Sequence, residues 1–427
     1  MTQRRRTTRG RLMVAVAAAA ALASAACTAS AGGTGSAAPI GAADTSSSAS
    51  ASAGTSAAAG AAEITANPAG AKALNPTTPI KVSVNGGRLT TLSLVNAQGK
   101  HVTGTMAADG TSWQSTEVLG YSHTYSLHAV AVNPDGQRTA KKYTFTTLTP
   151  SNMTLPYMQR AGGYSLDNGA TYGVGIVPVI HFDEPISNKA AAEKALVVTS
   201  TPAVTGVWDW VDDQDVHYRP QKYWAPGTKV TVKAKVYGVE VGPGMYGQSD
   251  VSTSFTIGRS QISVANDATH MVNVYINGKL TRRMPTSMGR GGYVTGTGGQ
   301  QISLWTMSGT YTVLAHENPA IMSSASFGLP ATSPDGYAPE KIYYATKISV
   351  DGIYLHQLDT TVWAQGHQDL SHGCLNLNYD NASWYFKLSR IGDPVEVKNT
   401  TGPSIQQWQN GDWSVPWSTW VKGSALH

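Results

Sequence analysis

A histidine and a cysteine lie eighteen residues apart near the C-terminal end of the chain, in the sequence YLHQLDTTVWAQGHQDLSHGCLNL at 354–377. Cys374 directly follows Ser371-His372-Gly373, and His356 is the earlier histidine. A thiol becomes a strong nucleophile when it loses its proton, and an adjacent imidazole lowers the thiol pKa by stabilising the thiolate. We therefore expect Cys374 to be a nucleophile with a lowered pKa and His356 to be its base.

The residues around this pair fit acyl transfer. Gly373 would allow an acyl group to approach the backbone closely. The backbone N–H groups of Gly373 and Cys374 could then form an oxyanion hole. If Gly352–His356 is a strand, His356 points to one face, and Ile353 and Leu355 point to the other.

The pattern of a histidine, fourteen residues and then Ser-His-Gly-Cys-Leu-Asn resembles the L,D-transpeptidase catalytic (YkuD-like) domain. The resemblance extends to MPTSMGR at 284–290, to Gly336-Tyr337 and to TPAVTGVWDWVDDQDVHYRP at 201–220. Residues 79–427 as a whole are similar to the lipoprotein-type members of that family, which carry two N-terminal Ig-like domains.

This resemblance implies roles for individual residues. Cys374 would be the acylated nucleophile, His356 the general base, and the Gly352 carbonyl would orient the imidazole. His372 would belong to the same catalytic set. Substrate contacts are implied for Tyr337, Met322, Ser371, Gly373 and Asn376. Gln357 stands where relatives often have a serine, which puts a catalytic role for a side chain at that position in doubt.

The activity implied by the resemblance is the formation of 3→3 peptidoglycan cross-links, from a donor tetrapeptide stem to the side-chain amine of residue three of an acceptor stem. β-Lactams of the carbapenem type are implied as covalent inhibitors, and no metal or organic cofactor is expected. An L,D-carboxypeptidase that hydrolyses stem peptides would use the same first half-reaction and stays open. A wall-binding adhesin with a decayed active site is the non-enzymatic alternative, against which the intact His356/Cys374 pair argues.

A zinc site is the chemical rival of the catalytic pair. His356, His367, His372 and Cys374 offer nitrogen and sulfur ligands, which zinc favours. The sequence contains neither H-x₃-H nor C-x₂-C spacing here, so we expect no metal.

The N-terminus predicts export. Residues 1–11 carry five arginines and no acid, and an apolar run of about fifteen residues follows, too short for a membrane span. Cys27 follows Ser24-Ala25-Ala26, which is typical of a lipidated signal at the outer face of the membrane. Ordinary cleavage that discards Cys27 stays open. We therefore assign residues 1–27 to a signal peptide, and the position of Cys27 favours the lipoprotein type.

The charge of the chain gives no support to nucleic-acid binding. The formal net charge is +5, and the five arginines of the signal account for all of it. What remains is close to neutral, so no nucleic-acid partner is expected.

The rest of the chain predicts a mainly β protein. Residues 28–78 are rich in Ala, Ser and Gly and are expected to be a flexible linker. Short alternating segments separated by turn signals then predict two Ig-like β-sandwiches. A β-rich catalytic domain with one short helix at Asn381–Leu388 follows. The expected boundaries are 79–150 and 151–258 for the sandwiches, 259–398 for the catalytic domain and 399–427 for a Trp-rich extension.

Two further segments carry specific expectations. Residues 315–337 contain no convincing element but several large apolar side chains, among them Met322 and Phe327. We expect this segment to be a lid over bound substrate. The extension carries four tryptophans within thirteen residues, which predicts that it packs back onto the catalytic domain.

Overall fold

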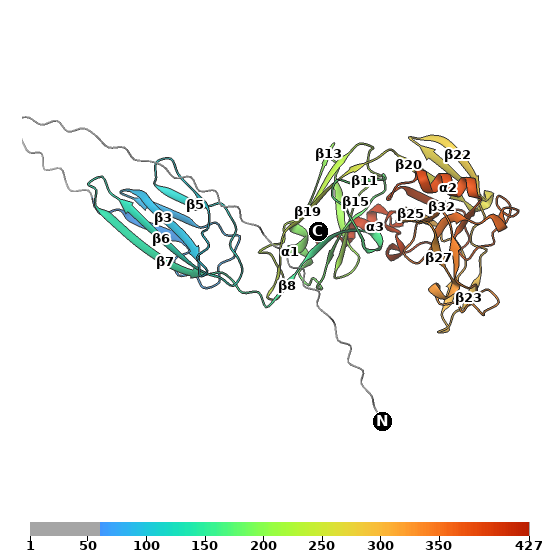
Figure 1. Cartoon of the computed structure of the whole chain (residues 1–427), viewed down its shortest axis with the longest axis horizontal. Coiled ribbons are helices and arrows are strands. Elements are labelled where there is room, and N and C mark those ends of the chain that lie inside the picture. Colours follow the sequence, from blue (N-terminus) through green and yellow to red (C-terminus); the bar gives the residue numbers. More distant parts are fainter. Residues whose placement is uncertain (1–59, 427) are drawn as a thin grey trace, which may run out of the picture. The chain divides into compact units, whose positions relative to one another are not determined.

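The computed structural model describes residues 60–426, which form β-rich domains in chain order (Figure 1). The mainly β class expected from the sequence is confirmed. The predicted signal peptide, Cys27 and most of the predicted linker lie outside the described residues. In the described part of the chain, no helix is both long and apolar enough to cross a membrane.

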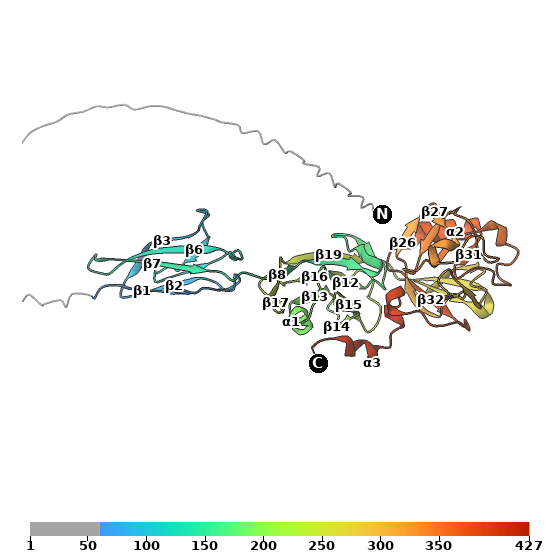
Figure 2. The same cartoon turned by 90° about the horizontal axis from the view of Figure 1, so that it is seen from below.

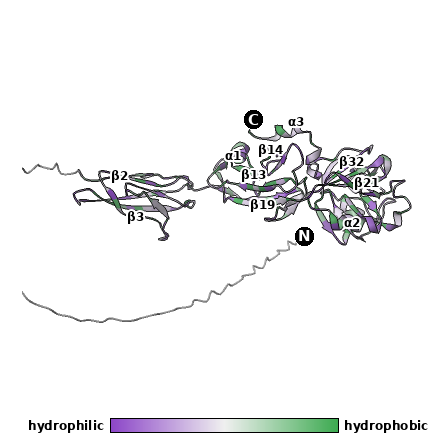
Figure 3. Ribbon diagram, turned by 90° about the horizontal axis from the view of Figure 1, so that it is seen from above, coloured by the Kyte–Doolittle hydropathy of each residue, from purple (hydrophilic) through white to green (hydrophobic). Residues whose placement is uncertain are grey.

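The first domain is an antiparallel sandwich of two sheets whose buried residues share one core. In β2, Val82 and Val84 are buried while the residues between and beside them are exposed, and Figure 3 shows similar interleaving along other strands. The four-stranded sheet has the order β1 (Glu63–Asn67), β2 (Lys81–Asn85), β5 (Ser112–Ser115), β4 (Gly104–Met106). The three-stranded sheet has the order β3 (Arg88–Asn96), β6 (Thr124–Val132), β7 (Arg138–Thr146).

Strand β1 corrects the predicted extent of the linker. It pairs with β2 in the register Ile64↔Val84, and Ile64 is only 3% exposed. The first sandwich therefore begins well before residue 79. Composition hid this strand because its single large apolar side chain stands in an alanine-rich background.

The second domain is a larger sandwich with its own core. It contains one short α-helix, α1 (Lys189–Lys194). One sheet has the order β10 (Tyr164–Ser165), β9 (Pro156–Arg160), β12 (Pro178–Phe182), β15 (Asp215–Pro220), β14 (Gly206–Trp210). The facing sheet has the order β11 (Thr171–Tyr172), β19 (Val251–Ile257), β16 (Lys229–Ala234), β13 (Leu196–Thr201). A small third sheet has the order β17 (Glu240–Gly242), β18 (Met245–Gly247), β8 (Asn152–Thr154).

The third domain holds the Ser-His-Gly-Cys segment, and one core cluster joins its two main sheets. Two short ribbons accompany them, β23 (Tyr293–Thr295) with β24 (Gln301–Ser303) and β27 (Ala320–Met322) with β28 (Glu340–Ile342). The first sheet has the order β22 (Lys279–Pro285), β21 (Met271–Ile276), β20 (Gln261–Asn266), β32 (Pro394–Lys398), β25 (Gly309–Thr312). The second has the order β26 (Ala315–Glu317), β29 (Ala345–Lys347), β30 (Tyr354–Gln357), β31 (Leu375–Leu377).

Local sequence signals determine two elements of this domain. Asn277 and Gly278 both have positive φ and join β21 to β22, and Asn-Gly is the dipeptide that a two-residue type I′ hairpin turn prefers. Helix α2 (Tyr379–Leu388) covers the predicted 381–388 and starts two residues earlier. Asn378 caps it, because its side-chain oxygen accepts the backbone N–H of Asn381 at 2.9 Å.

The C-terminal tail packs on the catalytic domain, as expected, and also against the second sandwich (Figure 2). The indole N–H of Trp420 donates to Val207 O at 2.9 Å, and that of Trp413 donates to Gly175 O at 2.7 Å. Trp408 is 61% exposed, so one of the four tryptophans does lie in water. The tail elements are η5 (Gln407–Gln409), η6 (Asp412–Ser414), α3 (Trp417–Trp420) and η7 (Val421–Gly423).

The side chain that the tail surrounds is Arg219 of β15. Its guanidinium carbon lies 4.9, 5.4 and 4.3 Å from the ring centres of Trp413, Trp417 and Trp420. It also donates to the Val415 carbonyl at 2.6 Å. Such cation–π contacts are stronger when water is excluded, and Arg219 is only 2% exposed.

We expect Trp420→Ala to lower the free energy of unfolding by about 3–5 kcal/mol, because it leaves a cavity and removes one wall around Arg219. Denaturant unfolding of the purified protein measures this. Trp408→Ala is the matched control and should cost less than about 0.5 kcal/mol. Equal losses in the two variants would contradict the anchoring role of the tail.

Candidate active site

Strands β30 and β31 bring the predicted catalytic residues together. They pair in parallel, with Leu355 beside Leu375 and His356 beside Asn376. Leu355 and Leu375 point into the core of the domain. By alternation, His356 and Cys374 lie on the opposite face, where the same register makes them diagonal neighbours.

A cavity of about 620 Å³ lies against this face. Of the residues predicted from the sequence, Cys374, Gly352, His372, Gly373, Tyr337 and Met322 line it. His356, Ser371 and Asn376 do not line it. His356 is 4% exposed, so it lies in the protein behind the cavity wall, whereas Cys374 is half-buried in the wall itself.

Hydrogen bonds of the Asn376 backbone hold β31 in place. The backbone N–H of Asn376 donates to Ser287 O at 2.9 Å, and its carbonyl accepts the Thr286 hydroxyl at 3.1 Å. Asn376 is 2% exposed. Asn376 therefore lies outside the cavity lining, and its backbone ties β31 to residues 286–287.

A different carbonyl orients the histidine from the one predicted. His356 Nδ1 lies 3.0 Å from Gln357 O, whereas Gly352 O accepts the Cys374 thiol at 3.6 Å. A carbonyl partner requires the proton on Nδ1 and leaves a lone pair on Nε2. Any residue can supply this backbone carbonyl, which explains why glutamine is compatible with the site. The Gln357 side chain itself points to Asp359 Oδ2 at 2.5 Å.

The thiol of Cys374 and the imidazole of His356 are both neutral at pH 7. Burial lowers the pKa of His356 to about 4, although the Gln357 carbonyl opposes this shift. Burial also raises the pKa of Cys374 to about 11, the Tyr354 backbone N–H opposes this, and the charge of Asp351 adds to it. The prediction that the pKa of Cys374 is lowered is therefore wrong for the enzyme without bound substrate. The nearby imidazole is itself desolvated and uncharged at neutral pH, so it cannot stabilise a thiolate.

Hydrogen bonds hold the nucleophile loop, residues 371–374, on both sides. The Ser371 hydroxyl donates to Cys374 O at 2.6 Å and accepts the N–H of Gly373 at 3.0 Å. The Thr306 hydroxyl donates to Gly373 O at 2.7 Å and accepts the N–H of Gly289 at 2.9 Å. Gly373 has a φ of +137°, which strongly favours glycine.

These hydrogen bonds exclude the Gly373 N–H from the predicted oxyanion hole. They also show that Thr306, which the sequence did not point to, holds the nucleophile loop. The Gly373 N–H is engaged by Ser371, so it does not point to a substrate oxygen as predicted. Thr306 is only 1% exposed and lies 68 residues before Cys374. No local sequence signal marks it, because only the tertiary fold brings it to the loop.

His372 and the predicted lid meet at the cavity. His372 Nε2 lies 2.8 Å from Asp335 O, and burial lowers the pKa of the imidazole. Its ring centre lies 5.4 Å from that of Tyr337 and 6.0 Å from that of Phe327. His372 is therefore a neutral side chain that connects the nucleophile loop to the segment 323–337.

The predicted lid has more regular structure than expected. β26, β27 and η3 (Ser324–Phe327) all lie within 315–337. The Ser324 hydroxyl donates to Tyr337 O at 3.0 Å and accepts the Tyr337 N–H at 2.9 Å, which closes the base of the loop. Met322 and Phe327 line the cavity, and Ile321 is 64% exposed at its edge.

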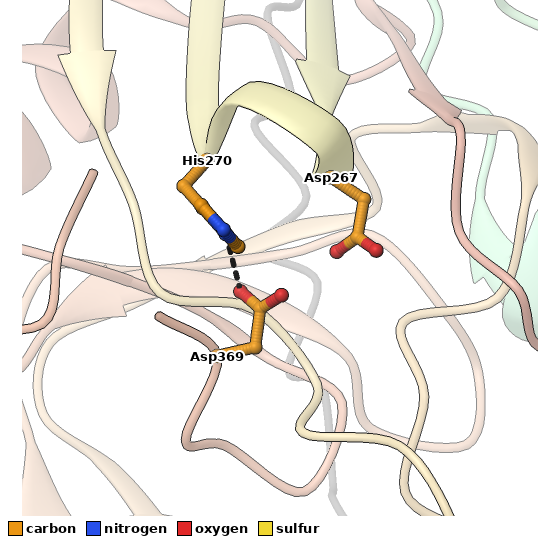
Figure 4. Close-up of side chains that lie close together, drawn as sticks. All are labelled: Asp267, His270 and Asp369. Carbon is orange, nitrogen blue, oxygen red and sulfur yellow. Dashed lines mark hydrogen bonds and ion pairs between the residues drawn. The ribbon is translucent and has the colours of Figure 1, made fainter. Parts of the chain in front are cut away.

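A second cluster consists of Asp267, His270 and Asp369, the last of which lies two residues before the nucleophile loop (Figure 4). Their ligand atoms lie within 4.8 Å of one another, a donor set compatible with a divalent cation. It is not the zinc set considered from the sequence. Asp369 Oδ1 lies 3.2 Å from His270 Nδ1 and accepts the backbone N–H of Met288 at 2.6 Å. Asp369 thereby ties the loop before Cys374 to the segment 284–290.

The two carboxylates of this cluster repel each other. Burial, and then the charge of Asp369, raise the pKa of Asp267 from 3.8 to about 6. The folded state thus binds a proton more tightly than the unfolded state, so its stability falls as pH rises from about 4 through about 6.

We expect Asp267→Asn to raise the melting temperature at pH 7.5 by roughly 2–4 °C, since it removes about 1 kcal/mol of repulsion. The gain should disappear at pH 4, where Asp267 is already protonated in the folded protein. Thermal scans at the two pH values test this. A gain of equal size at both would show that charge repulsion is not the cause.

A buried neutral imidazole on the same face of the sheet as a thiol that lines a large cavity is typical of a cysteine acyl-transfer enzyme. Comparison with known proteins agrees with this class. Residues 260–397 match the L,D-transpeptidase catalytic domain, and residues 71–240 match the bacterial Ig domain.

Curated relatives match over most of the chain. L,D-transpeptidase 2 of Mycobacterium tuberculosis (strain CDC 1551 / Oshkosh) is 38% identical over 357 residues, which is 83% of either protein. L,D-transpeptidase 5 of strain ATCC 25618 / H37Rv is 36% identical over 375 residues, which is 86% of this chain and 78% of that protein. A solved structure of the LD transpeptidase LdtMt1 in complex with imipenem is 31% identical, covers 57% of this chain and 99% of that one, and has a TM-score of 0.46.

The chain belongs to the L,D-transpeptidase family. It is an L,D-transpeptidase, an enzyme that cross-links peptidoglycan and acts in the cell wall. The family and the activity expected from the Ser-His-Gly-Cys segment are thereby confirmed.

Proposed function

We propose that this enzyme forms 3→3 cross-links with Cys374 as the acylated nucleophile and His356 as the general base. The observation that carries this proposal is the neutral thiol–imidazole pair on one face of β30 and β31, with the thiol in the cavity wall. The Gln357 carbonyl holds the imidazole tautomer whose Nε2 can accept a proton.

In the first half-reaction, the Cys374 thiol turns from Gly352 O and gives its proton to His356 Nε2. Its sulfur attacks the donor carbonyl carbon, whose bond to the terminal D-Ala nitrogen then breaks. The imidazolium returns the proton to that leaving nitrogen. The products are a thioester on Cys374 and free D-Ala.

In the second half-reaction, the uncharged side-chain amine of residue three of the acceptor attacks the thioester carbon. His356 takes one proton from the amine, the carbon–sulfur bond breaks, and the proton passes to the sulfur. The products are the new amide and the Cys374 thiol, so both half-reactions start and end with a neutral pair.

Two donors suit the tetrahedral oxyanion. One is the backbone N–H of Cys374 itself, and the other is the hydroxyl of Tyr337. Burial raises the pKa of Tyr337, and a negative charge on the sulfur of Cys374 would raise it further, so this phenol keeps its proton. Both residues line the cavity. A donor that is already desolvated and fixed in place stabilises charge as it develops.

Hydrolysis would share the first half-reaction and differ only in the group that attacks the thioester. Incubating the purified enzyme with a donor stem peptide and an excess of an acceptor stem separates the two outcomes. Mass spectrometry should find the amide-linked dimer as the main product. A product mixture that consists of hydrolysed tripeptide alone would contradict transpeptidation.

We expect Cys374→Ser and His356→Gln each to lower the rate of cross-linking at least about 100-fold, because each removes one member of the proton-transfer pair. Dimer formation followed by mass spectrometry measures this loss. His316→Gln is the matched control. His316 is a half-buried histidine whose pKa is also lowered by burial, but it bonds Ser389 and does not line the cavity. Cross-linking retained by Cys374→Ser would refute the assignment.

Carbapenem-type β-lactams should acylate Cys374, since their strained amide presents the same carbonyl to the thiol. Intact-protein mass spectrometry should show one adduct, which is lost in Cys374→Ala. The acylation rate should stay level from pH 6 to 8, because the neutral pair persists there, and should fall as pH approaches about 4, the pKa of His356. A steep rise between pH 6 and 8 would instead indicate a thiol with a nearly normal pKa.

The N-terminal segment supports an anchor. Export through the signal and lipidation of Cys27 would place the enzyme at the outer face of the cell membrane, and residues 28 to about 60 would tether it. We expect the mature protein to partition into the detergent phase and Cys27→Ala to move it to the aqueous phase. A wild-type protein found only in the aqueous phase would favour ordinary secretion.

A further inference from the structure

Asp351 is the one carboxylate among the described residues that line the Cys374 cavity. It lies at the tip of the turn that joins β29 to β30. That turn is closed by hydrogen bonds from Ile348 N to Ile353 O at 2.9 Å and from the Ile353 N–H to the Ser349 hydroxyl at 2.8 Å. Gly352, next to it, has a φ of +102°, which suits glycine and turns the chain back toward the cysteine.

A buried amide from the C-terminal tail fixes this carboxylate. Gln409 Nε2 donates to Asp351 Oδ2 at 2.6 Å, while Gln409 Oε1 accepts the Gln406 N–H at 2.8 Å. The second bond determines which end of the amide faces Asp351, and Gln409 is only 4% exposed. One oxygen of Asp351 is thus held in place, and the exposed side chain leaves the other for a ligand.

The charge of Asp351 works against the first half-reaction. It is one of the causes that raise the pKa of Cys374, so it lies near the sulfur and opposes thiolate formation. Lys347 also lines the cavity, with its ammonium 5.8 Å from the ring centre of Tyr354. Within residues 60–426, the structure records no ion pair between Lys347 and Asp351.

A charge that hinders acylation but is held by a dedicated buried amide suggests a role in the other half-reaction. We propose that Asp351 binds the side-chain ammonium of the acceptor stem and positions its nitrogen beside the thioester on Cys374. This inference rests on the proposed function. The acceptor is the substrate that arrives as a cation, and a carboxylate held by a charge-assisted hydrogen bond is the complementary group.

Before attack, the acceptor ammonium releases one proton to solvent and becomes the amine that enters the second half-reaction described above. Asp351 forms no covalent bond. It raises the local concentration of the acceptor and holds its nitrogen near the carbon that it attacks.

Asp351→Asn separates the two half-reactions. In the purified protein, the KM for the acceptor stem should rise roughly 10-fold to 100-fold, the range for losing one hydrogen bond to a charged group. Acylation of Cys374 by a carbapenem should be as fast as in the wild type or faster, because a negative charge near the thiol is removed. Asp351→Glu should restore part of the acceptor affinity.

Two comparisons make the test specific. Hydroxylamine is a small amine that is uncharged at neutral pH, so its reaction with the thioacyl enzyme should not change in Asp351→Asn. Glu340→Gln is the matched control, since Glu340 carries a charge that acts on Tyr337 but does not line the cavity. It should leave the acceptor KM within about 2-fold of the wild type.

The outcomes are distinct. An acceptor KM that changes less than 2-fold in Asp351→Asn, or equally in Glu340→Gln, overturns the subsite. A rise in the donor KM instead of the acceptor KM also overturns it. If the wild-type enzyme is acylated but never forms a dimer, the proposed cross-linking fails, whatever Asp351 does. An equal final amount of carbapenem adduct in all variants verifies that each variant is folded. If Asp351→Asn is not folded, Asp351→Ser replaces it.

Discussion

The site depends on the parallel pairing of β30 with β31. This pairing places His356 and Cys374 on one face, although eighteen residues and the short helix η4 (Asp359–Thr361) separate them in the chain. Because Leu355 and Leu375 fill the core from the other face, a shift of one residue in either strand would bury the thiol or the imidazole in the core. The Thr306, Ser371 and Asp369 hydrogen bonds then hold the loop that leads into β31.

Burial of Cys374 and His356 determines that the proton rests on the sulfur and not on the imidazole Nε2. A low dielectric disfavours both the thiolate and the imidazolium, so the resting enzyme carries a thiol and a neutral base and no ion pair. Such a thiol is protected from indiscriminate oxidation in an enzyme that acts in the cell wall, because the thiolate is the form that is oxidised. Its reactivity then requires a substrate whose developing oxyanion is stabilised at the same moment, which favours a carbonyl seated in the cavity over a carbonyl in solution.

The C-terminal tail connects the second sandwich to the active site. Its tryptophans enclose Arg219, and Asp412 lies 3.0 Å from His217 of the same strand. Four residues before Trp413, Gln409 reaches Asp351 at the cavity, and Asn410 donates to the carbonyls of Thr312 and Ile348. A segment without a strand of its own can therefore determine the position of a turn next to the nucleophile, because the sandwich immobilises its far end.

Local sequence by itself determined the elements whose signals are short-range. The Asn277-Gly278 turn, the alternating strands and the α2 helix follow from φ preferences and side-chain period, and the Ser-His-Gly-Cys segment identified the family. Tertiary structure alone decided the rest. It brings the Thr306 hydroxyl to the Gly373 carbonyl. It makes the Gln357 carbonyl, and not that of Gly352, the hydrogen-bond partner of His356. It also bonds the Gly373 N–H, which was expected to face the oxyanion, to the Ser371 hydroxyl. It also raises the pKa of the Cys374 thiol, which the neighbouring residues in the sequence predicted to be lowered. Desolvation depends on all the atoms packed around a group, and the order of residues in the chain does not specify that packing.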